Sequence, residues 1–372
     1  MRGGVVRRLL WIGALGLAIL ILIALPDGIR TGRLMANLGK AAQHKGPSAP
    51  ISEVDVAARV GNEIRTARLY QPDIAALRTA VIFIPGLTPK GIQNDRFVSV
   101  ARALAGSGYL VLTPRLSGFD DFRLQEKAIS EIGFWRQYLR NSRQFGVRKT
   151  GVIGVSVGGT LALLAAARLP ECRDLDFVMS IGGYQDLEKC QTRWLSAAQG
   201  HDSHGRFPVQ FYGRWILMLM ALDEAPSSPD RDKLEQALTD LLAQATTSVS
   251  TSDLAPEAAR WYAMAVGDRT DDPELASRID AALRRRLQAL SAGEELSAVH
   301  CPVFLIHGAY DELIPPEETL QLESLLRSAD TTTLLTPVIS HTHPLLDRMP
   351  LWSKAKALAD GAIFLYRFVR VS

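Results

Sequence analysis

The sequence predicts an α/β fold in which helices cover both faces of a doubly wound, mostly parallel sheet of eight strands. Short, nearly continuous apolar runs alternate with segments of helical spacing, which is typical of buried parallel strands. Two alternating runs precede them and predict an antiparallel hairpin. A long helical segment interrupts the later alternation, and an unbroken apolar run lies at the amino terminus.

The strands and helices can be placed along the chain. The hairpin is expected over residues 52–60 and 63–70, on either side of Gly61-Asn62. The other strands are expected at residues 79–84, 109–113, 150–155, 177–181, 303–306 and 332–339. Helices are expected at residues 94–105, 122–145, 157–169 and 352–368, and within the interrupting segment at 213–222, 231–244, 256–266 and 275–290.

This pattern divides the 372 residues into one large domain with an insertion. The expected parts are an anchor at 1–30, a linker at 31–50, a first core part at 51–185, a helical lid insertion at 186–298 and a second core part at 299–372. The linker assignment depends on a stretch of small and polar residues with two prolines.

The composition excludes several classes of protein. The 42 Lys and Arg residues nearly balance 39 Asp and Glu residues and are scattered along the chain, so no nucleic-acid partner is expected. Three cysteines cannot form a disulfide scaffold or a zinc ribbon. His201 and His204 have H-x-x-H spacing without a further well-placed ligand. We therefore expect neither a metal nor a cofactor, and the oligomeric state stays open.

The apolar run from Leu9 to Leu25, extended by Val5 and Val6, approaches the roughly 20 residues that cross a bilayer. A cleaved signal peptide is the alternative, but no clean A-x-A site follows the run, so we expect a single-pass anchor formed by residues 5–25. Basic residues flank the run on both sides, which leaves both orientations open. The short basic tail favours an extracytoplasmic location for the rest of the chain.

The sequence Gly154-Val155-Ser156-Val157-Gly158 lies where a strand must turn sharply into a helix. This G-x-S-x-G pattern predicts an exposed serine hydroxyl on a strained turn, with the Val157 amide directed at a developing negative charge. A dinucleotide-binding loop is the alternative, with Asp174 or Asp176 as the ribose-binding acid. Its G-x-G-x-x-G spacing is missing.

Three further loops follow the carboxyl ends of strands and complete a candidate site. Asp311 can accept a hydrogen bond from the Nδ1–H of a histidine and so fix the tautomer of that histidine, although it can also simply cap a turn. His341 directly follows the last expected strand and is favoured as the base, with His343 as the alternative. The loop after residues 79–84 offers the Leu87 amide as a second oxyanion donor. Glu312 and Asp186 are substitutes for the acid, and His307 is expected to be structural.

Over residues 51–370 outside the insertion, the chain resembles the α/β-hydrolase superfamily of serine esterases and lipases. The residues that carry the resemblance are the turn at 154–158, the acid loop at 307–315, His341 and the Pro85-Gly86 loop. The resemblance implies Ser156 as nucleophile, His341 as general base and acid, Asp311 as its orienting partner, and the amides of Leu87 and Val157 as the oxyanion hole. The insertion falls where that family carries its lid. The family often has His-Gly where this chain has Pro85-Gly86.

The expected activity is hydrolysis of a small-molecule carboxylic ester through an acyl-serine intermediate, with an apolar acyl or lipid ester as a candidate substrate. A thioesterase, peptidase or acyltransferase would use the same triad. A membrane-tethered binding protein that retains only the fold is an alternative from another class. Aromatic residues and methionines near residues 207–220 can line an acyl pocket or form the buried face of a helix.

Overall fold

The computed structural model describes residues 26–73, 79–196, 207–222, 230–243, 249–267, 272–339 and 350–372. Eight strands in these ranges form one sheet in the order β1-β2-β4-β3-β5-β6-β7-β8. Their bounds are β1 (Ile51–Val60), β2 (Glu63–Pro72), β3 (Thr79–Ile84), β4 (Leu110–Pro114), β5 (Lys149–Val155), β6 (Phe177–Ile181), β7 (Val303–Gly308) and β8 (Thr331–Thr336). The hairpin β1–β2 and the pair β2–β4 are antiparallel, and all other neighbours are parallel. The predicted mostly parallel sheet of eight strands is confirmed.

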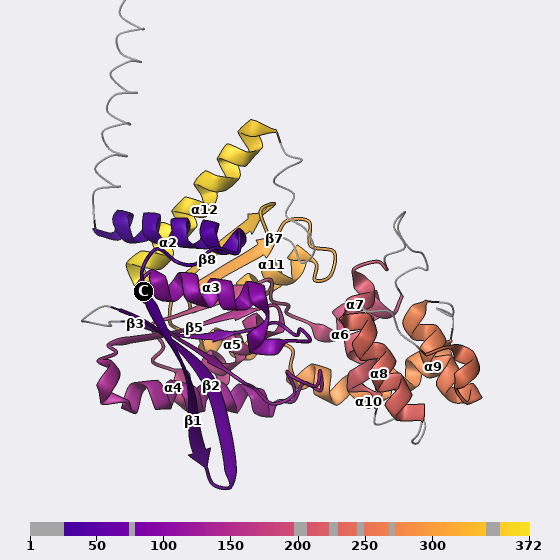
Figure 1. Ribbon diagram of the computed structural model, residues 1–372. Coiled ribbons are helices and arrows are strands. Elements are labelled where there is room, and N and C mark those ends of the chain that lie inside the picture. The colour runs from indigo at the N-terminus through magenta and orange to yellow at the C-terminus, as the bar shows by residue number, and fades with distance from the viewer. Residues whose placement is uncertain are drawn as a thin grey trace, which may run out of the picture.

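Helices cover the two faces of the sheet (Figure 1). One face carries α2 (Pro26–Ala42), α3 (Asp95–Gly106) and α12 (Leu351–Val371), and the other carries α4 (Lys127–Asn141) and α5 (Val157–Arg168), while α11 (Pro316–Leu325) packs beside β7. The helical segment lies to one side of the sheet and comprises α6 (Leu187–Leu195), α7 (Gln210–Met220), α8 (Asp230–Leu242), α9 (Pro256–Val266) and α10 (Pro273–Ala289). Each face buries its own apolar core.

Two elements are shorter than expected. The helix predicted over 122–145 extends only from Lys127 to Asn141; Phe122 adopts a left-handed backbone (φ 58°) that an α-helix does not accommodate, and an irregular loop separates it from α4. The buried Glu131 carboxylate holds the preceding loop by accepting hydrogen bonds from the amide and hydroxyl of Ser117 at 2.7 Å each. The strand predicted over 332–339 ends at Thr336, where its partner β7 ends at Gly308.

The first part of the linker expected over residues 31–50 is helical in the structure. Helix α2 extends through Ala42 and buries Thr31, Leu34, Asn37 and Ala41 along one side. Because only Leu34 among these is a large apolar residue, the helical periodicity was hidden in the sequence. The Asn37 side chain donates to Ser107 Oγ at 2.9 Å and accepts from the amide and hydroxyl of Ser48 at 3.0 and 2.9 Å, which joins α2 to the end of α3.

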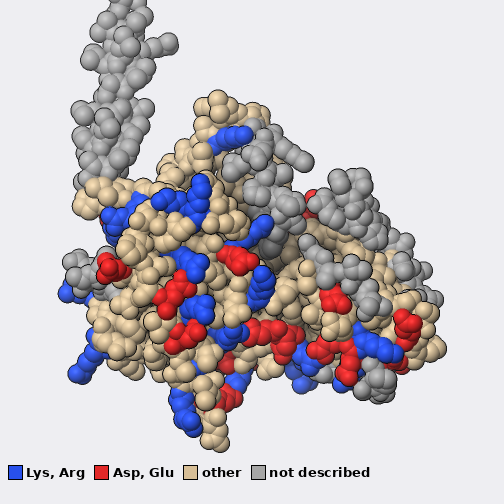
Figure 2. Space-filling view, viewed as in Figure 1, with Lys and Arg blue, Asp and Glu red and all other residues tan. Residues whose placement is uncertain are grey.

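None of the described helices is both long and apolar enough to cross a membrane. The apolar run at residues 5–25, on which the expected anchor depends, lies outside the described residues. On the face shown in Figure 2, Lys and Arg side chains are interspersed with Asp and Glu over the described core and the helical segment.

If α2 is part of the folded domain, replacing Asn37 with Ala should lower the free energy of unfolding by about 1–3 kcal/mol, because a buried amide and its partners lose their hydrogen bonds. Denaturant unfolding of the full chain measures this change. The exposed neighbour Arg33→Ala serves as control and should change stability by less than about 0.5 kcal/mol. An equally small effect of Asn37→Ala would mean that residues 26–42 behave as a linker after all.

Candidate active site

The register of the parallel strands brings the candidate loops to one edge of the sheet. Ile84 of β3 pairs with Gly154 of β5, and Val155 pairs with Ile181 of β6. Ile181 in turn pairs with Ile306 of β7, which pairs with Leu334 of β8. The loops that follow these strands therefore leave the sheet side by side, as expected for functional groups of an α/β sheet.

Ser156 lies between the end of β5 and the first residue of α5, with φ 54° and ψ −125°. Such a backbone costs about 1–3 kcal/mol for a residue with a side chain and persists only where its surroundings enforce it. The Ser156 amide donates to the Ile181 carbonyl at 2.7 Å, and its carbonyl accepts from Gly159 at 2.8 Å. The side chain is only half-buried and lines a cavity. This geometry is that of the predicted strained turn.

Glycines around Ser156 are required by close backbone approach. A Cβ at Gly154 would overlap the Gly158 carbonyl, and one at Gly158 would lie 2.5 Å from the Pro85 carbonyl oxygen. A Cβ at Gly86 would lie 3.2 Å from the Ser156 Cβ. The loop Pro85–Leu87 thus lies directly against the serine, which places the first two predicted components together.

The two predicted oxyanion donors occupy positions suited to that role. Val157 is the first residue of α5, where amides have no acceptor within the helix and the helix dipole favours negative charge. Leu87 is buried and follows Gly86 in the loop beside Ser156. Its carbonyl accepts a hydrogen bond from Tyr212 Oη of α7 at 2.8 Å, which fixes the loop from the side of the helical segment.

Asp311 follows β7 and is 5% exposed. Its Oδ1 accepts hydrogen bonds from the amides of Leu313 and Ile314 at 3.0 Å each, so the turn-capping role considered for this residue is present. Its Oδ2 lies 3.6 Å from Nε2 of the fully buried His307. The cap holds the carboxylate rigidly at the edge of the sheet that carries Ser156.

His307 is structural, as expected from its place inside β7. Its Nε2 donates to the Ile314 carbonyl at 3.0 Å, and its Nδ1 lies 2.5 Å from Thr319 Oγ1 of α11. It thereby joins the acid loop to α11. His341 and His343, the two candidate bases, lie outside the described residues, as do His201 and His204.

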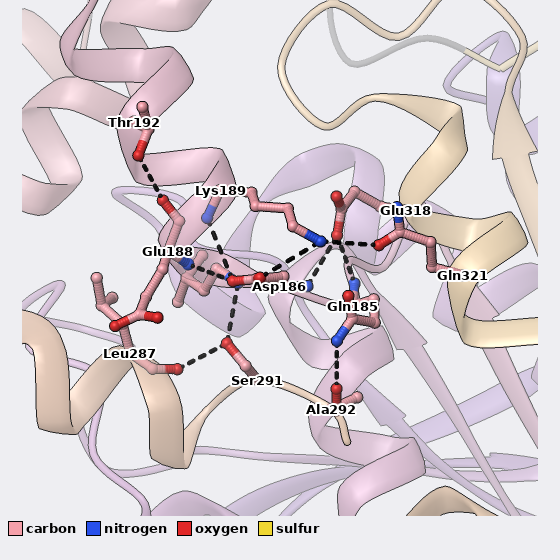
Figure 3. A network of polar contacts seen from close by, with 11 residues as sticks. Gln185, Asp186, Glu188, Lys189, Thr192, Leu287, Ser291, Ala292, Glu318 and Gln321 are labelled. Carbon is pink, nitrogen blue, oxygen red and sulfur yellow. Dashed lines mark hydrogen bonds and ion pairs between the residues drawn. The ribbon is translucent and has the colours of Figure 1, made fainter. Parts of the chain in front are cut away.

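The helical segment is joined to the core through a network of polar contacts shown in Figure 3. The buried Glu318 of α11 accepts hydrogen bonds from the amides of Gln185 and Asp186 at 2.9 and 2.8 Å. Gln185 and Ala292 exchange two further bonds, at 2.6 and 2.8 Å, so the chain enters and leaves the segment at the same point. Asp186, considered as a substitute acid, instead caps α6 by accepting from the amides of Glu188 and Lys189.

Helices α6 and α7 of this segment also hold the acid loop. Trp194 Nε1 donates to the Leu313 carbonyl at 2.8 Å, and Gln210 Nε2 donates to the Glu312 carbonyl at 3.3 Å. Arg214 is fully buried over the Phe211 ring and donates to the carbonyls of Trp194, Leu195 and Met264, and burial lowers the pKa of its guanidinium to about 10. The sequence gives no local signal for these contacts, because their partners are far apart along the chain.

A cavity of about 2130 Å³ opens beside Ser156 and is lined mainly by apolar side chains. Beneath the helical segment its lining includes Trp194, Tyr212, Trp215 and Met220. The aromatic and methionine-rich stretch of α7 is therefore both the buried face of a helix and part of a cavity wall. Pockets for drug-sized ligands span about 300–1,000 Å³, so this cavity has room for a large apolar substrate.

The acids of the dinucleotide alternative have other partners. Asp174 pairs with Arg136 and Arg140 at 2.6 and 2.8 Å, and Asp176 accepts from the Thr150 amide at 2.7 Å. Both precede β6, at the edge opposite Ser156. In the described part of the chain no cluster of three or more His, Cys, Asp or Glu side chains is suited to a metal ion.

The comparison with protein families matches residues 79–336 to the alpha/beta hydrolase fold. No curated protein matches the sequence. Among solved structures, the chain is similar to an esterase of Pyrobaculum calidifontis (17% identity, TM-score 0.45, covering 96% of this chain and 99% of the esterase). It is also similar to the acylaminoacyl peptidase of Pyrococcus horikoshii (14% identity, TM-score 0.47, covering 84% of this chain), of whose length it spans only 41%. The family match covers most of the sheet, the Ser156 turn and the Asp311 loop, and the chain belongs to the alpha/beta hydrolase fold family.

Proposed function

We propose that the protein is a serine hydrolase that cleaves a carboxylic ester, with Ser156 as its nucleophile. The observation that carries the proposal is the left-handed backbone of Ser156 between β5 and α5, with the Gly86 loop packed against the serine. Strain of this kind is maintained by close packing at functional sites and has no role in stabilising the fold. Ser156 lines the cavity together with Leu87 and Val157, whose amides are the proposed oxyanion donors.

In the proposed reaction, Ser156 Oγ attacks the ester carbonyl carbon while His341 takes its proton. The amides of Val157 and Leu87 stabilise the resulting oxyanion, and each such donor typically contributes about 3 kcal/mol to lowering the barrier. His341 then protonates the departing alkoxide, which leaves an acyl-serine. Water attacks this ester with the same base, releasing the acid and restoring Ser156. Asp311 would hold His341 in the required tautomer.

An ester is favoured as substrate because the cavity around Ser156 is lined mainly by apolar groups. A thioesterase, a peptidase or an acyltransferase would form the same acyl-serine and differ in the leaving group or in the acceptor. A protein that only binds ligands would not need the strained serine.

We further propose that the insertion, residues 186–298, acts as the lid of this site. Its support is that Tyr212, Trp194 and Gln210 bond directly to the two loops beside the cavity.

Anchoring by residues 5–25, with the enzyme outside the cytoplasm, is a further proposal, and it rests on the sequence pattern alone.

A fluorophosphonate probe should label the full chain covalently at one site, and Ser156→Ala should abolish labelling while leaving the thermal unfolding temperature unchanged. The reason is that only an activated serine beside oxyanion donors reacts rapidly with such a probe. In-gel fluorescence measures the labelling, and Ser99→Ala on α3 serves as the matched serine control. Labelling that survives in Ser156→Ala would contradict the assignment of the nucleophile.

Replacing each of the two candidate bases, His341 and His343, should lower kcat by very different amounts. We expect His341→Ala to lower kcat for a p-nitrophenyl ester by about 10²–10⁴-fold, since general base catalysis is lost, and His343→Ala to lower it by less than about tenfold. Steady-state rates of both variants at one pH provide the test. A larger loss in His343→Ala would assign the base to that residue, and equal mild losses would exclude both.

Tyr212→Phe should lower kcat about five- to tenfold with little change in KM, because the Leu87 loop loses the hydrogen bond that fixes it. Tyr138→Phe, which removes a hydroxyl from the distant helix α4, is the control and should leave both constants unchanged. If Tyr212→Phe changed only the unfolding temperature and not kcat, Tyr212 would be a structural residue without influence on the oxyanion loop.

A further inference from the structure

Four aliphatic side chains form a row across the sheet next to Ser156. Val155, Ile181, Ile306 and Leu334 are consecutive register partners on β5, β6, β7 and β8, so they lie side by side on one face. All four are only half-buried, although β5, β6 and β7 each have a parallel neighbour on both sides and only β8, which carries Leu334, is an edge strand. Parallel sheets are normally covered on both faces, so a partly open row of this kind is unusual.

Helices α3 and α12 pack on this face near the row, α3 against β3 and α12 against β7 and β8. Phe97 of α3 stacks on Phe83 of β3 at 4.2 Å between ring centroids, and Phe364 of α12 packs edge-on against Phe304 of β7 at 5.7 Å. Val100 of α3 and Leu365 of α12 are half-buried and line the same cavity as the row. In Figure 1, α2 crosses this face beside α3 and α12. Together these elements make a groove with the row as its floor.

The groove is continuous with the candidate active site. One cavity contains Ser156, the floor row, the α3 and α12 walls, and Leu34 and Leu38 of α2 at its far end. The four floor residues have no charged or hydrogen-bonding side chain. The polar lining residues near α3 lie at or before the beginning of that helix, at Thr88, Lys90, Asn94, Asp95 and Arg96, and His44 lines the cavity just after α2. The same cavity also extends beneath the helical segment, where Trp194, Tyr212 and Trp215 line it.

We propose that this groove binds a long, unbranched alkyl chain of the ester substrate. The inference rests on the proposed function, since the chain is placed by its continuity with Ser156. An alkyl chain would cover the floor row, which a polar or charged ligand would leave without favourable contacts. An extended shape fits a cavity whose lining includes residues of α3 and α12 as well as Leu34 and Leu38 of α2. The chain can belong either to the acyl group or to the alcohol, and both would make the same contacts.

Substrate chain length provides the test. A fully buried methylene raises kcat/KM by about fourfold, and the decanoate chain has about six more methylenes than the butyrate. Even with incomplete burial, the full-length protein in phospholipid nanodiscs should therefore hydrolyse p-nitrophenyl decanoate at least about tenfold more efficiently than the butyrate. Val100→Trp, and independently Leu365→Trp, should reduce this ratio to about two or less by filling the groove. Val98→Trp, a half-buried valine on the same helix that does not line the cavity, should keep the wild-type ratio. A parallel series of alkyl acetates shows whether the chain belongs to the acyl group or to the alcohol.

A binding measurement separates failure of the groove from failure of the proposed function. The fluorescent probe 11-(dansylamino)undecanoic acid should bind Ser156→Ala protein, and adding Val100→Trp or Leu365→Trp should weaken binding by about tenfold or more, whereas adding Val98→Trp should not. If the protein shows no Ser156-dependent hydrolysis, this binding measurement alone tests whether the groove holds an alkyl chain. The proposal is overturned if both groove variants keep the chain-length ratio in both ester series, which would place the chain beneath the helical segment, or if the probe binds all variants equally.

Discussion

The backbone of Ser156 is the constraint on which the rest of the site depends. Its positive φ is maintained because β5 passes into α5 without room for any Cβ at Gly154 or Gly158, and because the Gly86 loop closes over the same point. A strained turn of this kind stores about 1–3 kcal/mol, which the packing of a doubly covered sheet supplies. The register of the neighbouring strands then determines which other loops lie within reach of the serine.

The helical segment bonds directly to the loops beside Ser156. It is clamped to the core by Glu318 and Gln185 at its base, and its Tyr212 and Trp194 bond to the loops on either side of the cavity. These are directional contacts from buried or half-buried donors to backbone carbonyls, so they fix loop conformation rather than merely bury area. Folding of this segment and preorganisation of the candidate oxyanion loop are therefore coupled.

The sheet and most helices were predictable because their signals are local. Apolar runs, glycines and prolines marked β3, β5 and the turn at Ser156 within a few residues. The features that the sequence pattern missed depend on distant partners. Helix α2 is held by contacts with the end of α3, and β8 ends at the residue where its partner strand β7 ends. Likewise, the hydrogen bond from Tyr212 to Leu87 joins residues far apart in the chain, so no local spacing pattern predicts it.

In the proposed reaction, the strained turn makes Ser156 a nucleophile that carries an acyl group. To detect this acyl-serine, the full chain is mixed rapidly with excess p-nitrophenyl ester, quenched in acid and analysed by tandem mass spectrometry. We expect a burst of about one p-nitrophenol per chain wherever deacylation is the slower step, with the acyl mass on Ser156. An acyl group found on a different residue of the folded protein, or turnover without any trapped adduct at Ser156 under acid quench, would contradict the proposed reaction.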